Sequence, residues 1–318
     1  MTTLVSGVKP TGRPHIGNYF GAMKQWVDLQ NEYDDVFAMI ADMHALNFIQ
    51  NGDEMRSNTF DLVVDYLAIG LDPKKVSLFK QSEVPEHAEL CWAFDTITTM
   101  PYLMRAHAFK DAEAKNKEIS VGSFNYPMLM AADILLYGAD IVPVGQDQKQ
   151  HVEYARDTAE KFNRVFGQVD GTDVFKLPKE LIQEDVATVP GIDGRKMSKS
   201  YGNHIELFAT DDEIRKAVMS IVTDSNGGVP QNVYAIHALL RSKEELDVLY
   251  KEKEGKYKDL KEALIADLIA LIAPLRERRA AIAADPEMVR RVLDEGRDRA
   301  RARASATMLR AKRAMGLI

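Results

Sequence analysis

Near the start of the chain, Leu4–Asn18 reads LVSGVKPTGRPHIGN, a short apolar run that leads into a glycine-rich loop. The run Leu4–Val8 predicts a strand, and the pattern of Asn18–Tyr33 predicts the helix that follows the loop. The first N–H groups of such a helix have no partner within it, so a loop of this kind often holds an anion. The stretch therefore predicts an α/β fold with a ligand site at the end of its first strand.

The same alternation of apolar runs and amphipathic stretches continues through the first half of the chain. The predicted strands are Val36–Ala41, Val76–Phe79 and Ile141–Val144, and the predicted helices are Asp53–Ile69, one from Pro85 onward, and Asp147–Val165. Strands buried on both faces and separated by helices indicate a parallel sheet. Such sheets bind ligands at the carboxyl ends of their strands.

After about Ile205 the pattern is helical throughout. The predicted helices are Asp211–Val222, Tyr234–Leu240, Lys243–Lys253, Tyr257–Leu271 and Pro286–Met315. We therefore predict two domains, an α/β domain over residues 1–204 and an all-helical domain over residues 205–318. The last helix has room to pack back on the first domain, and the sequence leaves this open.

The composition is that of a folded protein, with 318 residues, 46% of them hydrophobic and 28% charged. The single cysteine, Cys91, excludes an intrachain disulfide and any Cys-based zinc or iron–sulfur site. The first residues do not resemble a signal peptide, and no apolar stretch reaches the roughly 18 residues that span a bilayer. We expect a cytoplasmic protein with no membrane contact.

The formal net charge is −7, so attraction to nucleic acid would have to come from a local basic patch. Arg276–Arg313 is such a stretch, with eleven Arg and one Lys against three Asp and three Glu, or 12 − 6 = +6. The pairs Glu287/Arg291 and Glu295/Arg299 have the spacing of ion pairs along a solvated helix. A surface that faces nucleic-acid phosphate is the alternative interpretation.

The first loop has the residues of a phosphate site. Its glycines permit tight turns and close backbone approach, whereas Arg13-Pro14 excludes a P-loop, which requires Lys followed by Ser or Thr. His15 lies where the next helix begins, and from there it could stabilise charge on a transferring phosphoryl group. A glycine-rich turn with an incidental histidine is the plainer alternative.

A second candidate loop is Lys196-Met197-Ser198-Lys199-Ser200, flanked by Gly191, Gly194 and Gly202. Two lysines on a glycine-hinged loop could clamp phosphates and meet the transition state of phosphoryl chemistry. A lone loop of this composition is more often solvated surface. The two loops together, in this order and about 180 residues apart, indicate a common nucleotide site.

This pair of loops resembles the HIGH and KMSKS motifs of class I aminoacyl-tRNA synthetases, with Asn18 where the first motif would have its second histidine. The resemblance implies a Rossmann-like catalytic domain that binds ATP-Mg²⁺, joins an amino acid to AMP with release of pyrophosphate, and passes it to the 3′-terminal ribose of tRNA. It implies no resident metal, and a helical domain that binds the anticodon. It assigns catalytic roles to Thr11, His15, Asn18, Lys196 and Lys199.

A third match is Gly145-Gln146-Asp147-Gln148, which resembles the GxDQ element of the same family and would place Gly145 and Asp147 near the ribose. The ATP-binding residues implied by the resemblance are Lys9, Pro10, Thr11, Gly12, His15, Gly17, Asn18, Gly145, Asp147, Lys196, Met197, Ser198 and Lys199.

The stretch Ser123–Gly138 predicts a mostly apolar helix in which Asp133 is the sole acid. Helical spacing puts Tyr126, Met130, Asp133 and Tyr137 on one face. A buried carboxylate is costly without donors, so Asp133 is either satisfied within the protein or accepts an N–H from a ligand. An indole N–H is donor only and needs such an acceptor.

The residues from Tyr126 to His151, and the opening SGVKPTGRPHIGNYFGA, resemble the tryptophanyl-tRNA synthetases more than their tyrosyl relatives. By implication Asp133 reads the indole nitrogen, and tRNA(Trp), ATP and L-tryptophan are the substrates of a homodimer. His44 could equally be a core or loop histidine. The implied tryptophan-binding residues are Val5, His44, Tyr126, Met130, Asp133, Val142, Val144 and Gln148.

Two features depart from that family or stay open. Lys9 stands where many members have Gln, and the polar stretch Lys110–Ser120 is either a solvated loop or a further ATP contact. The rival interpretations are a tyrosyl-tRNA synthetase, a small-molecule adenylyltransferase, and a catalytically silent tRNA-binding paralogue. The last of these has no need of a phosphate clamp.

Overall fold

The computed structural model describes residues 2–114, 118–182, 189–222 and 228–318. Within those ranges the side chains of Ala108, Asp111, Ala112 and Asp147 are outside the description. Some candidate ATP contacts therefore lie outside the described part. They are Lys115 and Lys117 of the polar stretch and the side chain of Asp147.

A five-stranded parallel sheet forms the centre of the fold, in the order β3-β2-β1-β4-β7. Its strands are β1 (Thr3–Val8), β2 (Asp35–Ile40), β3 (Val76–Lys80), β4 (Ile141–Val144) and β7 (Lys179–Ile182). β1 and β2 pair in register from Thr3 with Asp35 to Val8 with Ile40. The predicted α/β fold class is confirmed.

Both faces of the sheet are buried, as the apolar strands predict. Leu4 and Ile40 belong to a core that includes Trp26 and Leu264, whereas Val5 and Phe37 belong to a second core. Neighbouring residues of a strand point to opposite faces, so β1, β2, β3 and β4 each contribute to both cores. Among the helices that contribute to these cores are α2 (Lys24–Leu29), α4 (Gly52–Ala68), α5 (Glu86–Ile97), α8 (Val121–Leu135) and α9 (Lys149–Phe166).

The prediction of one helix over Asn18–Tyr33 is wrong in its detail. The segment consists of α1 (Ile16–Asn18), a π-helical turn over Tyr19–Met23, and α2, which ends at Leu29. The side-chain amide of Gln30 donates to the carbonyls of Val27 and Gly70, at 2.8 and 3.2 Å. These bonds fix the chain at the end of α2, so the helix does not continue to Tyr33.

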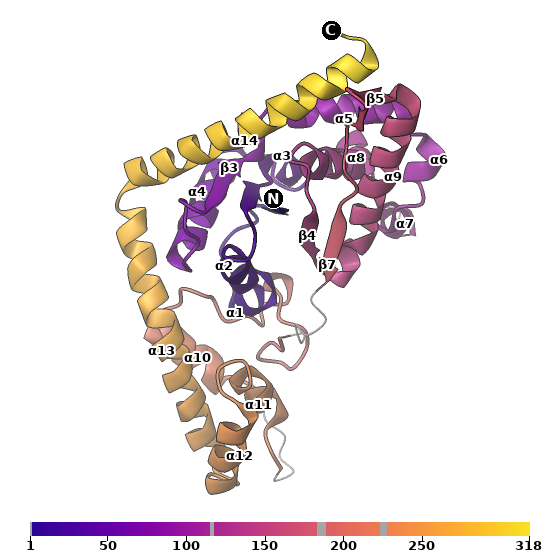
Figure 1. The fold of residues 1–318 in the computed structure, drawn as a ribbon. Helices are drawn as coiled ribbons and strands as arrows, with labels where there is room; N and C mark the ends of the chain where they lie inside the picture. The colour runs from indigo at the N-terminus through magenta and orange to yellow at the C-terminus, as the bar shows by residue number, and fades with distance from the viewer. Residues whose placement is uncertain (1, 115–117, 183–188, 223–227) are drawn as a thin grey trace.

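The second half is helical, as predicted, with α10 (Asp211–Met219), α11 (Gln231–His237), α12 (Lys243–Glu252), α13 (Tyr257–Ala283) and α14 (Pro286–Met315). α13 runs on past its predicted end at Leu271, with Pro274 inside it. Beyond that proline, Arg276 and Arg279 bond to Ala209, Asp211, Asp61 and Asp65, and these contacts hold the extra turns in place. Figure 1 shows α13 leading from the group of α10, α11 and α12 up to the sheet.

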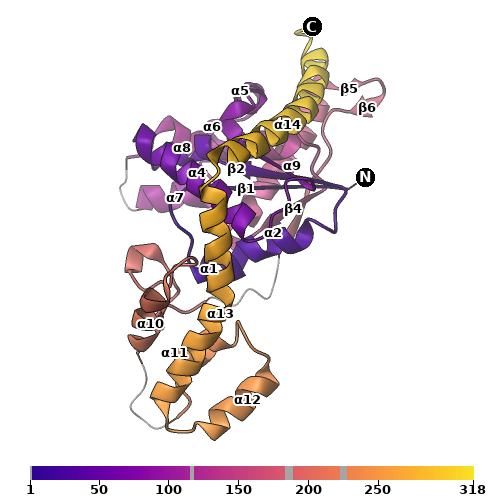
Figure 2. The same ribbon diagram turned by 90° about the vertical axis from the view of Figure 1, so that its left-hand side faces the viewer.

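α14 lies back across the edge strand β3 and continues past the hairpin of β5 (Gln168–Val169) and β6 (Thr172–Asp173) (Figures 1 and 2). The approach is close because Gly296 faces β3: a Cβ atom there would lie 1.9 Å from the carbonyl oxygen of Leu78. Arg299 donates to the hydroxyl of Ser77 and to the carbonyls of Pro73 and Val76.

The basic residues of α14 thus make more contacts with the rest of the protein than their spacing in the sequence predicted. Arg303 pairs with Asp35, and Lys312 pairs with Glu89. Glu287 pairs with Arg290 rather than with Arg291, and Arg299 faces β3 rather than Glu295. Over the described ranges, no helix has the length and apolar character needed to cross a bilayer.

Candidate active site

The two candidate loops come together through backbone hydrogen bonds. The N–H of Ile16 donates to the carbonyl of Ile205 at 2.9 Å, and the N–H of Leu207 donates to the carbonyl of Pro14 at 3.0 Å. The segment that follows the lysine loop therefore runs antiparallel to the first loop, with His15 opposite Glu206. Residues nearly 190 positions apart in the chain form one site.

Lys199 closes this arrangement from the second loop. Its Nζ donates to the backbone carbonyl of Thr11 at 3.1 Å. Gly12 has a φ of 89°, and a Cβ atom at that position would lie 3.7 Å from Lys199 Nζ. Burial lowers the pKa of the Lys199 ammonium. An ammonium at this position can donate to a phosphate oxygen as well as to the carbonyl of Thr11.

His15 caps the first turn of α1. Its Nδ1 accepts the N–H of Asn18 at 3.2 Å, and the Asn18 side-chain oxygen accepts the N–H of His15 at 3.1 Å. This use of Nδ1 leaves Nε2 to donate to a ligand. Burial first, and then the neighbouring charges of His204 and Lys199, lower the pKa of His15 to about 4.

The reciprocal cap gives Asn18 a structural contact that the sequence analysis did not foresee. Gly17 is required next to it, because a Cβ atom there would lie 2.9 Å from His15 Nδ1 and 3.4 Å from the sulfur of Met197. Met197 is buried, and so links the lysine loop to the first motif by packing as well as by hydrogen bonds.

Asn203 sets the shape of the lysine loop. Its side-chain oxygen accepts the N–H of Ser198 at 2.8 Å, and its amide donates to the carbonyl of Lys196 at 3.1 Å and to Asp193 at 2.7 Å. Gly191 makes room for this side chain, since a Cβ atom there would lie 2.4 Å from it. The side chain of Lys196 itself is exposed.

Asp133 lies at the centre of a buried polar network beneath the carboxyl ends of the strands. Its Oδ1 accepts from Gln81 Nε2 at 2.7 Å and contacts His87 Nδ1 at 2.7 Å, and its Oδ2 contacts His44 Nε2 at 2.8 Å. The far nitrogen of His87 meets the hydroxyl of Tyr137 at 2.8 Å. Burial acts to raise the pKa of Asp133, but the attraction and hydrogen bonds of His44 and His87 outweigh it and hold the pKa at about 2.

The other predicted tryptophan contacts come from the elements around this network. Val5 and Val142 are buried on β1 and β4, Val144 and Met130 are partly buried, and His44 belongs to the short helix α3 (Asp42–Ala45). The ring of Tyr126 lies 6.3 Å from that of His44, and its hydroxyl bonds to Nε2 of His151 on α9. Gln148 ends the turn before α9.

The remaining predicted ATP residues follow the first loop and β4. Pro10 is buried, and the ammonium of Lys9 lies 4.8 Å above the ring of Phe48, which is 70% exposed. Gly145 follows the end of β4 and is exposed.

Sequence reasoning missed Gln81, His87, Asn203 and His204. Gln81 and His87 come from the end of β3 and the start of α5, and only the folded sheet brings them to Asp133. His204 was detectable as a histidine four residues after the lysine loop, but nothing in its spacing linked it to His15.

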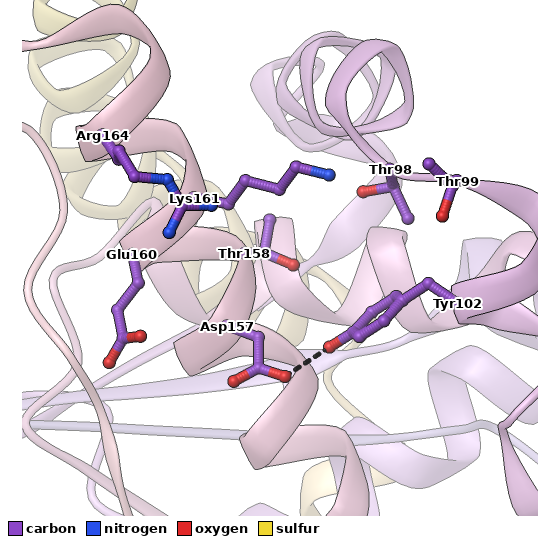
Figure 3. A pocket seen from close by; sticks show the side chains of 8 residues that line it. All are labelled: Thr98, Thr99, Tyr102, Asp157, Thr158, Glu160, Lys161 and Arg164. Carbon is purple, nitrogen blue, oxygen red and sulfur yellow. Dashed lines mark hydrogen bonds between the residues drawn. The ribbon is translucent and has the colours of Figure 1, made fainter.

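A separate hollow of about 290 Å³ lies between the end of α5, the short helix α6 (Met100–Leu103) and α9. Figure 3 shows that Lys161 and Arg164 line it together with Asp157 and Glu160, so its charges are mixed. The hydroxyl of Tyr102 donates to Asp157 at 2.6 Å across one side. None of the predicted site residues lines this hollow.

The sequence profile of the family described as "tRNA synthetases class I (W and Y)" matches residues 1–279. The chain belongs to this family. The prediction of a class I aminoacyl-tRNA synthetase, made from the two motifs, is confirmed.

Similarity to individual members of the family extends over the whole chain. A tryptophan–tRNA ligase of Fusobacterium nucleatum is 44% identical and covers 100% of this chain and 99% of its own length. That of Rhodopirellula baltica is 42% identical, with 99% of each covered. The crystal structure of tryptophanyl-tRNA synthetase from Campylobacter jejuni, complexed with ADP and tryptophan, superposes with a TM-score of 0.90 at 38% identity, covering 99% of this chain and 100% of that one.

Proposed function

We propose that this synthetase activates L-tryptophan with ATP and transfers the tryptophanyl group to tRNA(Trp), releasing pyrophosphate and then AMP. The observation that carries the proposal is the hydrogen bond from Lys199 Nζ to Thr11, which joins the two phosphate loops at one place. The full-length similarity to two tryptophan–tRNA ligases supports the choice of amino acid.

In the first step a carboxylate oxygen of tryptophan bonds to the α-phosphorus of ATP. The bond from that phosphorus to the bridging oxygen breaks, and pyrophosphate leaves with the electron pair. Negative charge grows on the leaving group, so Lys196, Lys199 and the neutral donor His15 stabilise the transition state more than the ground state. Thr11 and Asn18 complete the phosphate side of the site.

Asp133 selects the amino acid. A carboxylate oxygen has two lone pairs, so Oδ2, whose partner within the described residues is His44, can also accept an indole N–H. The ionised Asp133 offers no donor to the oxygen of a phenol. Val5, Val142 and Met130 supply apolar walls, and Tyr126 and Gln148 meet the amino and carboxylate ends.

Mg²⁺ enters this scheme with its substrate, as ATP-Mg²⁺. The described residues contain no group of three or more His, Cys, Asp or Glu side chains that could hold a metal ion. Mg²⁺ keeps several waters and takes phosphate oxygens readily, so the nucleotide itself can supply its ligands.

We assign ATP and amino-acid binding to residues 1–204, and anticodon binding to residues 205–318. A homodimer fits the exposed apolar side chains Trp92, Met100, Met104 and Val121, which lie on neighbouring elements, α5, α6 with the residue after it, and the start of α8. Burial of such a surface against a second copy would remove it from water. The lone cysteine, Cys91, is free and buried, which fits a reducing, cytoplasmic setting.

ATP–pyrophosphate exchange against a panel of twenty amino acids tests the proposal. Exchange should depend on L-tryptophan, and Lys199→Ala should abolish most of it, whereas Lys216→Ala on the surface of α10 should not. Tyrosine-dependent exchange would instead identify a tyrosyl enzyme.

Two further outcomes would replace the proposal. Adenylyl transfer to a phosphorylated small molecule, without binding of tRNA in a gel-shift assay, would indicate the small-molecule enzyme. Binding of tRNA without exchange for any amino acid would indicate a catalytically silent paralogue.

A further inference from the structure

His204 lies outside both motifs, on the segment that pairs with the first loop. The bridge sets His15 opposite Glu206, and alternate residues of an extended segment point the same way, so His204 shares the face of Glu206 and His15. The rings of His15 and His204 are 5.9 Å apart between centroids, at 49° to each other. A second imidazole therefore lies beside the histidine of the first motif.

The two nitrogens of His204 have different surroundings. Nδ1 is buried and has no hydrogen-bond partner among the described residues. A neutral imidazole has one N–H and one lone pair, and a buried N–H without an acceptor costs more than a buried lone pair. This assigns the proton to Nε2 and makes that atom the donor of His204.

The charged groups around His204 favour an anion. Lys199 extends from the same segment to Thr11, and Arg13 lies 3.8 Å from Glu206 across the bridge. His15 faces it from the start of α1, with the two ring centroids 5.9 Å apart. The acidic groups that act on this set are Glu206, whose partner is Arg13, and Asp65, which is paired with Arg279.

We propose that His204 donates a hydrogen bond from Nε2 to the β- and γ-phosphate end of ATP, and to the pyrophosphate that leaves. It transfers no proton. It adds a donor to those of His15, Lys196 and Lys199 where negative charge accumulates. The inference rests on the proposed function, because it concerns the same adenylation step.

Two variants distinguish the effect of the N–H donor of His204 from the effect of the volume of its ring. His204→Phe keeps the volume of the side chain and removes the N–H, whereas His204→Gln retains a donor. We expect His204→Phe to lower kcat/KM for ATP in exchange, and to raise the KM for pyrophosphate in the reverse reaction, by about 10–100-fold, as for loss of a hydrogen bond to a charged group. His204→Gln should recover most of that loss, and the KM for tryptophan should change in neither.

His107→Ala, at an exposed histidine of α7 (His107–Ala114), is the control for a histidine outside the site. Wild-type constants for ATP and pyrophosphate in His204→Phe would overturn the proposal. Equal losses in the Phe and Gln variants would also overturn it, as would an equal change in the KM for tryptophan, because these results indicate a purely structural role. If His204→Phe does not fold, His204→Leu, which also lacks an N–H donor, takes its place in the comparison with His204→Gln at the pyrophosphate KM. Failure of the wild-type enzyme to exchange with any amino acid would refute the proposed function itself.

Discussion

At the scale of single residues, the site depends on polar side chains whose protonation and tautomer are set by their neighbours. Asp133 is 3% exposed and ionised because Gln81, His44 and His87 surround it with partners. His15 is neutral near pH 7 because burial, together with nearby positive charge such as that of Lys199, lowers its pKa to about 4. The proposed acceptor for the indole and the proposed neutral donor for phosphate thus both arise from packing.

Asp133→Asn tests the first of these assignments. The amide can turn an N–H toward the indole N–H or toward one of its three protein partners, so one donor is left without an acceptor. We expect kcat/KM for tryptophan to fall by about 10–100-fold, equivalent to about 1–3 kcal/mol. Tryptophan-dependent steady-state exchange measures this, and unchanged kinetics would remove Asp133 from the binding site.

The pKa of His15 predicts a pH dependence of stability. The pKa is lowered from 6.5 to about 4 in the folded protein, so between those values the unfolded chain binds more protons. Stability should therefore fall as pH decreases from about 6.5 to 4, and His15 should remain neutral from pH 6 to 8. Urea unfolding at several pH values, compared between wild type and His15→Gln, measures the difference. An equally steep pH dependence in the variant would contradict the assignment.

At the scale of elements, α14 acts as a cover for β3. The edge of a sheet has unpaired backbone groups, and Arg299 satisfies the carbonyl of Val76 there. The helix comes this near only because residue 296 has no side chain.

Gly296→Ala should therefore destabilise the protein, although alanine favours a helix by about 1 kcal/mol over glycine. The added Cβ would meet backbone at 1.9 Å, and overpacking of this kind typically costs about 1–3 kcal/mol. Gly52→Ala in α4 is the matched control, since its Cβ would meet only the end of the Arg56 side chain, at 3.4 Å. Thermal unfolding should show a lower Tm for the first variant alone.

At the scale of the whole molecule, α13 joins the helical half to the sheet. Arg279 bonds to Asp65 and Asp61 of α4, and its guanidinium lies 5.3 Å from the ring centroid of Phe208. Asp65 is 1% exposed, and burial, opposed by Arg279, raises its pKa to about 6.

Arg279→Met would leave Asp65 buried without its cation. The expected loss of stability is about 3–5 kcal/mol, against less than about 1 kcal/mol for Arg290→Met, whose partner Glu287 is exposed. Denaturant unfolding of the two variants compares them directly, and equal losses would show that the buried pair has no special weight.

The sequence predicted the parallel sheet because apolar strands such as Val36–Ala41 are short, continuous and flanked by amphipathic helices. It did not predict β7, because Lys179–Ile182 is four residues long and only partly buried. The predicted end of α13, at Leu271, came too early, because the helix continues through Pro274. A proline inside a helix is tolerated where the later turns are anchored. The motif residues could be identified from the local order of residues in the sequence. His87, Gln81 and His204 could not, because their contacts exist only in the tertiary fold.

The cover over β3 has a consequence for any attempt to shorten the chain. A fragment that stops at residue 204 would lose α14, and the bare backbone of Val76–Lys80 would become a template for strand pairing with another molecule. It would also lose the Ile205 and Leu207 bonds to the first loop. The α/β half would then be prone to aggregate, so the boundary at residue 204, where the predicted pattern becomes helical, is a poor place to end a fragment.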